Sequence, residues 1–203
     1  MNQAKIRRHL DRLAMLDADL CRGLELLRYP KPRIRAPGFE TLLSTIVSQQ
    51  ISTEAAASIM QRVRALLPRM QADEVLRLPD GALREAGLSR RKVEYVEGLA
   101  LAILDGRFDP EMLAAMDDAD AVAAITSLRG FGAWSAEIYL MFSLQRSDVF
   151  PAGDLALRVA LGRLKGLDSV PGEREARALV EHWSPYRSAG SLFLWHYYRG
   201  APT

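Results

Sequence analysis

The chain has 203 residues, of which 49% are hydrophobic and 26% are charged, and its formal net charge is +2. This length allows one large domain or two small ones, and the near balance of charges does not indicate a nucleic-acid partner. The single cysteine, Cys21, excludes an intrachain disulfide and an iron–sulfur cluster held by four cysteines. Because the sequence shows no signal peptide and no apolar run long enough to span a membrane, we expect an intracellular protein.

Apolar residues recur at spacings of three to four along most of the chain, which predicts helices. In chain order, the predicted helices cover about 4–16, 17–27, 39–50, 52–67, 72–78, 80–87, 88–105, 117–127, 133–145, 154–165, 172–183 and 186–198. Three prolines make residues 29–38 a loop or an extended link. Only residues 33–36 alternate with period two. Since several of these segments are short, we predict an all-α fold of about ten helices.

The stretch LRGFGAWSAEIYL, residues 128–140, predicts two helices joined by a tight turn. Gly130 and Gly132 would allow positive φ in this turn, and without side chains they would let an anion approach the backbone. The first turn of the second helix adds unpaired N–H groups and the positive end of the helix dipole. A DNA phosphate fits such a site. The simpler interpretation is a glycine C-cap followed by an ordinary turn.

Asp154 follows the hairpin in the stretch VFPAGDLALRVAL, residues 149–161. The link from Gln145 to Gly153 is long enough to return Asp154 to the neighbourhood of the hairpin. Asp154 also occupies a predicted N-cap, where the helix dipole favours the ionised carboxylate. Capping alone is sufficient to explain an aspartate at this position.

These two stretches together resemble the hairpin, the Gly/Pro-rich loop and the aspartate of helix-hairpin-helix base-excision DNA glycosylases. The branch with the strongest resemblance is DNA-3-methyladenine glycosylase II, the alkylpurine glycosylases. Three further stretches are similar to the family in the same order: GFETLLSTIVSQQIS, GLSRRKVEYVEGLA and WSPYRSAGSLFLWHYY. The resemblance runs from about Gly38 to Tyr198.

The resemblance implies a role for individual residues. Asp154 would be the catalytic carboxylate, and the backbone N–H groups of Gly130, Gly132 and Ser135 would bind a DNA phosphate. A monovalent cation, Na⁺ or K⁺, would lie at the carbonyls of Thr126, Leu128 and Phe131. No other cofactor is implied.

Trp134 and Trp195 match aromatic positions of the base pocket. In glycosylases that also cut the backbone, the residue matching Trp134 is a lysine nucleophile, so this chain is expected to remove the base only. A cationic alkylated purine would bind well over an indole face. Both tryptophans could instead be core residues.

Gln50, with Gln49 beside it, occupies the place of the wedge that fills the gap left by a flipped nucleotide. Some relatives have leucine there, and both glutamines could instead be exposed residues at a helix end.

The resemblance further implies two helical lobes with the active site between them. We expect one lobe at about 38–120, carrying the wedge corner, and a second lobe of about 1–37 plus 121–203, carrying the hairpin and Asp154. The expected activity is excision of 3-methyladenine or 7-methylguanine from double-stranded DNA. We expect the protein to act as a monomer, inside the cell with the DNA, and without a membrane partner. A non-catalytic DNA-binding module, a glycosylase for another lesion and a plain helical scaffold remain alternatives.

Overall fold

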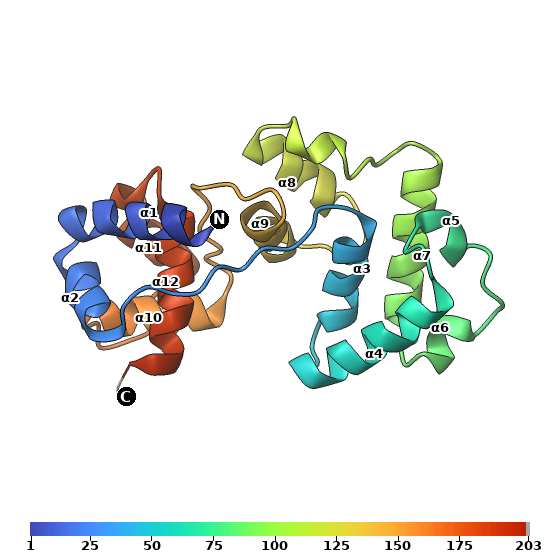
Figure 1. Ribbon diagram of the computed structural model, residues 1–203, viewed down its shortest axis with the longest axis horizontal. Coiled ribbons are helices and arrows are strands. Elements are labelled where there is room, and N and C mark those ends of the chain that lie inside the picture. Colours follow the sequence, from blue (N-terminus) through green and yellow to red (C-terminus); the bar gives the residue numbers. More distant parts are fainter. Residues whose placement is uncertain (202–203) are drawn as a thin grey trace. The chain divides into compact units, whose positions relative to one another are not determined.

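The computed structural model describes residues 1–201, and every regular element in that range is a helix (Figure 1). Twelve α-helices and two short 3-10 helices are present in these residues. The all-α prediction is confirmed. None of the helices described is long and apolar enough to cross a bilayer.

The chain divides into two compact units, which we call the terminal unit and the central unit. The central unit comprises Arg35–Tyr139, and the terminal unit combines Met1–Ile34 with the chain from Leu140 onward. The division therefore falls inside α9 (Ala133–Phe142). From the sequence we expect the hairpin in the lobe of Asp154, whereas the structure groups it with the wedge corner.

The terminal unit is built around α12, drawn in red in Figure 1. Its helices are α1 (Gln3–Leu16), α2 (Ala18–Leu27), α10 (Leu155–Lys165), α11 (Glu173–Leu179), η2 (Glu181–Trp183) and α12 (Arg187–Gly200). Helices α1, α2 and α10 each pack against α12. The largest fully buried side chains here include Trp183 and Phe193. Gly23 allows α2 to approach α12 closely, because a Cβ there would lie 2.9 Å from the Phe193 ring.

A buried carboxylate, Asp17, joins three parts of the terminal unit. Its side chain is 1% exposed and accepts hydrogen bonds from Lys165 Nζ at 2.6 and 2.8 Å and from Trp183 Nε1 at 2.7 Å. It also caps α2 by accepting from the Leu20 N–H. Burial alone would raise the pKa of Asp17, but these hydrogen bonds and the charge of Lys165 lower it to about 2. The end of α10 is thereby fixed to the start of α2.

The central unit packs α3 against α4 and α7. Its helices are α3 (Phe39–Ser48), α4 (Thr53–Leu66), α5 (Ala72–Val75), α6 (Ala82–Glu85), α7 (Arg90–Leu104), η1 (Met112–Ala114) and α8 (Asp118–Thr126). Leu42, Leu43, Ile46 and Val47 form the fully buried face of α3. This is the face that the apolar spacing of the sequence predicts.

Candidate functional site

The hairpin joins α8 to α9 through a turn that only glycine fits at position 130. Gly130 has φ of +97°, and a Cβ there would lie 2.4 Å from the Tyr95 ring. Gly132 is different: its φ is not positive, and an added Cβ would meet nothing within 4 Å. The expectation of positive φ is thus confirmed for Gly130 and wrong for Gly132. The open space beside Gly132 would allow a ligand to approach the backbone closely.

The first turn of α9 carries Trp134 and Ser135. Trp134 is 42% exposed, which is unusual for a large aromatic side chain, whereas Ser135 is buried. The first N–H groups of a helix have no partner within it, and the Ala136 N–H donates to the Gly132 carbonyl at 3.1 Å. This arrangement can hold an anion at the helix end.

The wedge corner lies between α3 and α4, and its two glutamines differ. Gln49 donates its side-chain N–H to the Gly130 carbonyl at 2.7 Å, so it ties the corner to the hairpin. Gln50 is exposed and has φ of +57°, a left-handed conformation that costs a non-glycine residue free energy. Of the two glutamines, Gln50 is therefore the one whose side chain is presented to solvent.

Lys92 is a residue of this region whose role the sequence analysis missed. It lies in α7, which Ser89 caps, and donates Nζ to the Val47 carbonyl near the end of α3 at 2.7 Å. Burial lowers the pKa of Lys92. The side chain of Lys92, in the stretch GLSRRK, thus supports the wedge corner.

In the terminal unit, Asp154 is the N-cap of α10, as predicted. Its Oδ1 accepts the Leu157 N–H at 3.0 Å, and its own N–H donates to the Pro151 carbonyl at 2.9 Å. The side chain is partly exposed. Asp154 is thus held in one orientation at the N-terminus of α10.

The loop before Asp154 is fixed by residues of the closing stretch WSPYRSAGS. Arg187 forms a bidentate ion pair with Asp148 at 2.8 Å for each contact, and Ser184 donates to the same carboxylate at 2.7 Å. Although burial raises the pKa of Asp148, these hydrogen bonds bring it below its usual range. The Val149 N–H donates to Ser188 Oγ at 2.9 Å. The sequence matched this stretch to the family without revealing that it anchors the loop before Asp154.

Trp195 lies on α12 and is largely buried, with 8% of its surface exposed. Its ring packs against Phe142 at 5.6 Å between centroids. The Arg33 guanidinium lies 5.9 Å from the centre of the indole ring. One face of this indole therefore already accepts a cation.

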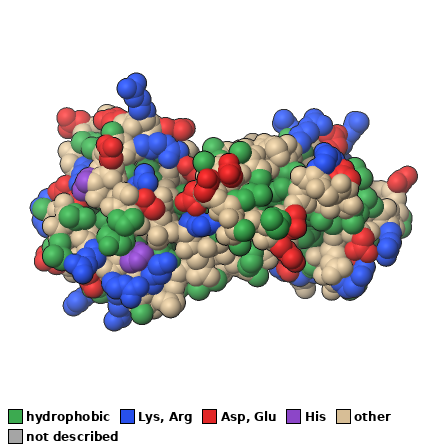
Figure 2. Space-filling view, turned by 90° about the horizontal axis from the view of Figure 1, so that it is seen from above, with side chains coloured by type: hydrophobic (Ala, Val, Ile, Leu, Met, Phe, Trp, Pro, Cys, Tyr) green, Lys and Arg blue, Asp and Glu red, His purple; other side chains and the backbone are tan. Residues whose placement is uncertain are grey.

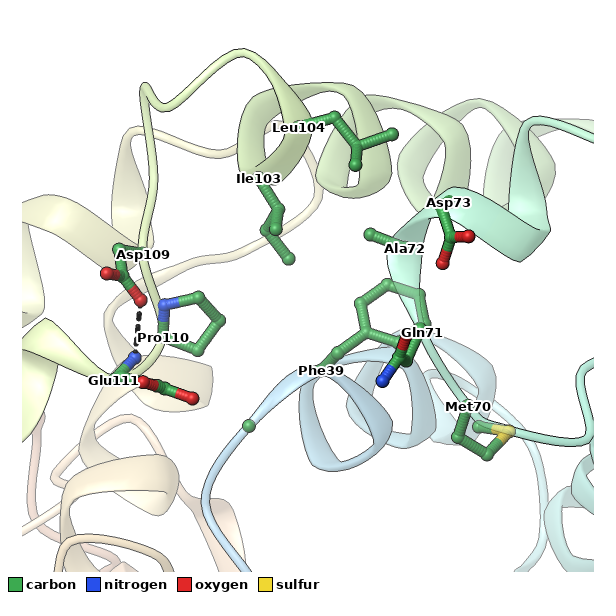
Figure 3. A pocket seen from close by; sticks show the side chains of 11 residues that line it. Phe39, Met70, Gln71, Ala72, Asp73, Ile103, Leu104, Asp109, Pro110 and Glu111 are labelled. Atoms are coloured by element: carbon green, nitrogen blue, oxygen red, sulfur yellow. Dashed lines mark hydrogen bonds between the residues drawn. The ribbon is translucent and has the colours of Figure 1, made fainter.

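A different hollow in the central unit contains none of these residues (Figure 3). It measures about 460 Å³ and is lined by Phe39, Gln71, Ile103, Leu104 and Pro110 among others. Since it includes neither an aromatic of the predicted base pocket nor Asp154, it is not the candidate site.

The site residues fall into two groups, one in each unit. The central unit joins Gln49 to the hairpin by a hydrogen bond. The terminal unit carries Asp154, its anchored loop and Trp195. In the residues that the structure describes, no group of three His, Cys, Asp or Glu side chains is arranged to hold a metal ion.

Residues 43–185 match the model of the HhH-GPD superfamily of base excision DNA repair proteins. The chain belongs to this superfamily. The match contains the wedge corner, the hairpin and Asp154, so the resemblance that these stretches indicated is confirmed.

Relatives of this HhH-GPD protein include DNA-3-methyladenine glycosylases of two yeasts. The Saccharomyces cerevisiae protein is 36% identical over 195 residues, covering 77% of this chain and 65% of the relative. DNA-3-methyladenine glycosylase 1 of Schizosaccharomyces pombe is 29% identical over 161 residues, covering 77% of this chain and 71% of the relative. The chain thus spans about two thirds of the length of these relatives.

Two solved structures are similar over nearly the whole chain. The 3-methyladenine DNA glycosylase of Schizosaccharomyces pombe in complex with abasic DNA has a TM-score of 0.83 at 26% identity, covering 93% of this chain and 95% of that one. A DNA-3-methyladenine glycosidase from Bacillus halodurans has a TM-score of 0.81 at 31% identity, covering 92% and 87%. The fold is that of the helix-hairpin-helix glycosylases.

Proposed function

We propose that this HhH-GPD protein is a monofunctional DNA glycosylase that removes alkylated purines, of the 3-methyladenine and 7-methylguanine type, from double-stranded DNA. The observation that carries the proposal is Asp154, oriented at the N-terminus of α10 by the Leu157 N–H and by an anchored loop. The names of its yeast relatives support the same substrate class.

The reaction begins when the damaged nucleotide leaves the stack, which costs a few kcal/mol of unstacking and unpairing energy. Gln50, exposed at the wedge corner, fills the gap. Gln49 holds the corner against the hairpin, and the hairpin binds a backbone phosphate through the N–H groups of Gly130, Gly132 and Ser135. Its carbonyls at Thr126, Leu128 and Phe131 provide neutral oxygen ligands, which suit Na⁺ or K⁺ better than a transition metal.

Trp134 and Trp195 would receive the flipped base. A purine methylated at N3 or N7 is cationic, and a cation binds well over an indole face. The contact of the Arg33 guanidinium with the Trp195 ring supports this chemistry. A cationic purine is already a good leaving group, so the site needs no strong general acid.

Asp154 acts when the N-glycosidic bond breaks and positive charge develops on the sugar. An ionised carboxylate stabilises that charge electrostatically and accepts a proton from the water that attacks the sugar. The products are the free base and an abasic site. Because Trp134 has no nucleophilic nitrogen comparable to a lysine, the DNA backbone stays intact.

The assay is release of methylated bases from methylated duplex DNA, separated by chromatography. Wild-type protein should release 3-methyladenine or 7-methylguanine, and Asp154→Asn should release almost none. Asp168→Asn, an exposed aspartate beyond the end of α10, is the matched control and should behave as wild type.

The assay also separates the alternatives. A non-catalytic DNA-binding module would bind the DNA and release no base. A glycosylase for oxidised or deaminated bases would release nothing here and would act instead on an oligonucleotide carrying its own lesion.

A further inference from the structure

The terminal unit carries a second hollow, of about 430 Å³, that none of the residues discussed as catalytic or phosphate-binding lines. The charged side chains that line it are all basic: Lys31, Arg33 and Arg199. His196 lies beside them. No carboxylate is among its lining residues in the part of the chain that the structure describes. We call this hollow the basic pocket. Figure 2 shows Lys and Arg side chains gathered on part of this unit's surface.

One wall of the basic pocket is the extended segment of residues 28–33, which we call the strap. The Tyr29 hydroxyl donates to Asp11 of α1 at 2.6 Å, and Gln3 of α1 donates to the Pro30 carbonyl at 3.2 Å. Pro30 and Pro32 each fix φ of the backbone near −65°. These restraints reduce the conformational entropy that Lys31 would lose on binding a ligand.

The other wall is α12, which supplies Leu192, His196 and Arg199. His196 Nε2 donates to the Leu27 carbonyl at 2.9 Å and so joins α12 to the chain that leads into the strap. Lys31 and Arg199, from the two walls, are both exposed. The pocket thus has fixed walls and accessible cationic ends.

The basic pocket adjoins the aromatic residue proposed for the base pocket. Arg33 lines the basic pocket and also lies over the Trp195 ring at 5.9 Å. Leu192 and His196, which line the pocket, are neighbours of Trp195 on α12. A nucleotide stacked at Trp195 would therefore place its flanking backbone within reach of this cluster of cations.

We propose that the basic pocket binds a phosphate of the DNA backbone, as a second phosphate site in addition to the hairpin. This inference rests on the proposed function for the place of Trp195. Lys31 and Arg199 provide the charge, and contacts of this kind position DNA without reading its sequence. The terminal unit then has a DNA-binding site of its own, independent of the hairpin in the central unit.

The test compares Lys31→Gln/Arg199→Gln with Arg8→Gln/Arg12→Gln, a control pair that removes the same two charges from exposed positions on α1 of the same unit. Binding to an undamaged fluorescent duplex is measured by anisotropy over a range of salt concentrations. Each lost phosphate contact reduces the slope of log K against log salt by about 0.9. We expect the pocket pair to reduce the slope by about 1 to 2 and to weaken binding several-fold, while the control pair changes the slope little. Thermal melting verifies that both variants are folded.

Equal effects of the two pairs would overturn the proposal, since net charge alone would then explain them. The alternative ligand of the basic pocket is a free phosphate ion, which has the same charge and hydrogen-bonding chemistry as a phosphate of the DNA backbone. If inorganic phosphate stabilised wild type but not the pocket pair against heat, and both pairs bound DNA like wild type, the pocket would be a phosphate-ion site and not a DNA site.

A different result would contradict the proposed function: wild-type protein that releases no methylated base. Because the anisotropy probe carries no lesion, the salt slopes still report on the basic pocket in that case.

Discussion

At the scale of single residues, Gly130 and Gly132 show how two glycines in one turn serve different purposes. Gly130 combines a positive φ with contact against Tyr95, so its need for glycine is structural. Gly132 has neither constraint, so its lack of a side chain matters only if something outside the chain approaches it.

Alanine at each position separates these purposes. Gly130→Ala should destabilise the fold by about 2 kcal/mol, because the Cβ must displace Tyr95 and φ is unfavourable. Gly132→Ala should leave the melting temperature nearly unchanged and weaken DNA binding, since the methyl group would obstruct a phosphate. Melting curves and DNA titrations on both variants test this, and normal DNA binding by folded Gly132→Ala would remove the phosphate contact from the proposal.

Gln50 provides a second prediction for a single residue, because its backbone is in the left-handed conformation and its side chain is exposed. Gln50→Gly should raise stability by about 1 kcal/mol by relieving the left-handed backbone, and should lower excision by removing the wedge. Gln145, also exposed and with φ of +56°, provides the control. Gln145→Gly should give a similar gain in stability with unchanged excision. A Gln50→Gly variant with full activity would argue against the wedge.

At the scale of elements, the sequence predicted which segments are helices and where α10 begins, because capping and apolar spacing are local properties. Asp154 could be predicted as an N-cap from its position alone. The supports of the site could not be predicted, because they join distant parts of the chain. Gln49 meets Gly130 across 81 positions, and Arg187 meets Asp148 across 39. Neither pair has a periodicity or a spacing that a single sequence reveals.

The loop anchor leads to a prediction at this scale. Asp148→Asn loses the charge that orients Arg187 but retains a similar shape, so the loop that carries Asp154 should loosen. Because misplacement of a catalytic group by about 1 Å can reduce rate about a hundredfold, we expect the excision rate to fall more than tenfold while DNA affinity stays near that of wild type. Glu40→Gln, which breaks the exposed pair of Glu40 with Arg64, is the control and should leave the rate unchanged. Equal loss of affinity and rate in Asp148→Asn would indicate general damage to the fold instead.

At the scale of the whole molecule, each unit has a core of its own, and the site residues are shared between the units. The sequence predicts two lobes, with the hairpin in the lobe of Asp154. The division of α9 explains the difference: the hairpin joins the central unit because Gly130 packs against Tyr95 and bonds to Gln49. These contacts depend on tertiary packing and are invisible in local sequence.

Asp17 determines how the terminal unit responds to acid. Its pKa of about 2 in the folded protein lies below the ordinary 3.8, so its contribution to stability is complete above pH 3.8 and is lost as the pH falls toward 2. The contribution is about 2 kcal/mol. Asp17→Asn should lower stability at pH 7 by at least that amount and should flatten the pH dependence in this window. Urea unfolding of both proteins between pH 2 and 6 measures it, and parallel curves would contradict the role of Asp17.

In the proposed reaction, Asp154 accelerates cleavage of the glycosidic bond in addition to capping α10. The decisive measurement is the single-turnover excision rate from a duplex with one alkylated purine, at saturating protein, for wild type, Asp154→Asn and Asp154→Ser. Asn and Ser are both good N-caps, so the two variants should fold and bind DNA. We predict that both variants lose at least about a hundredfold in rate, because a pre-oriented charge stabilises the transition state by several kcal/mol. Excision within a few-fold of wild type by either folded variant would contradict it and leave Asp154 as a structural cap.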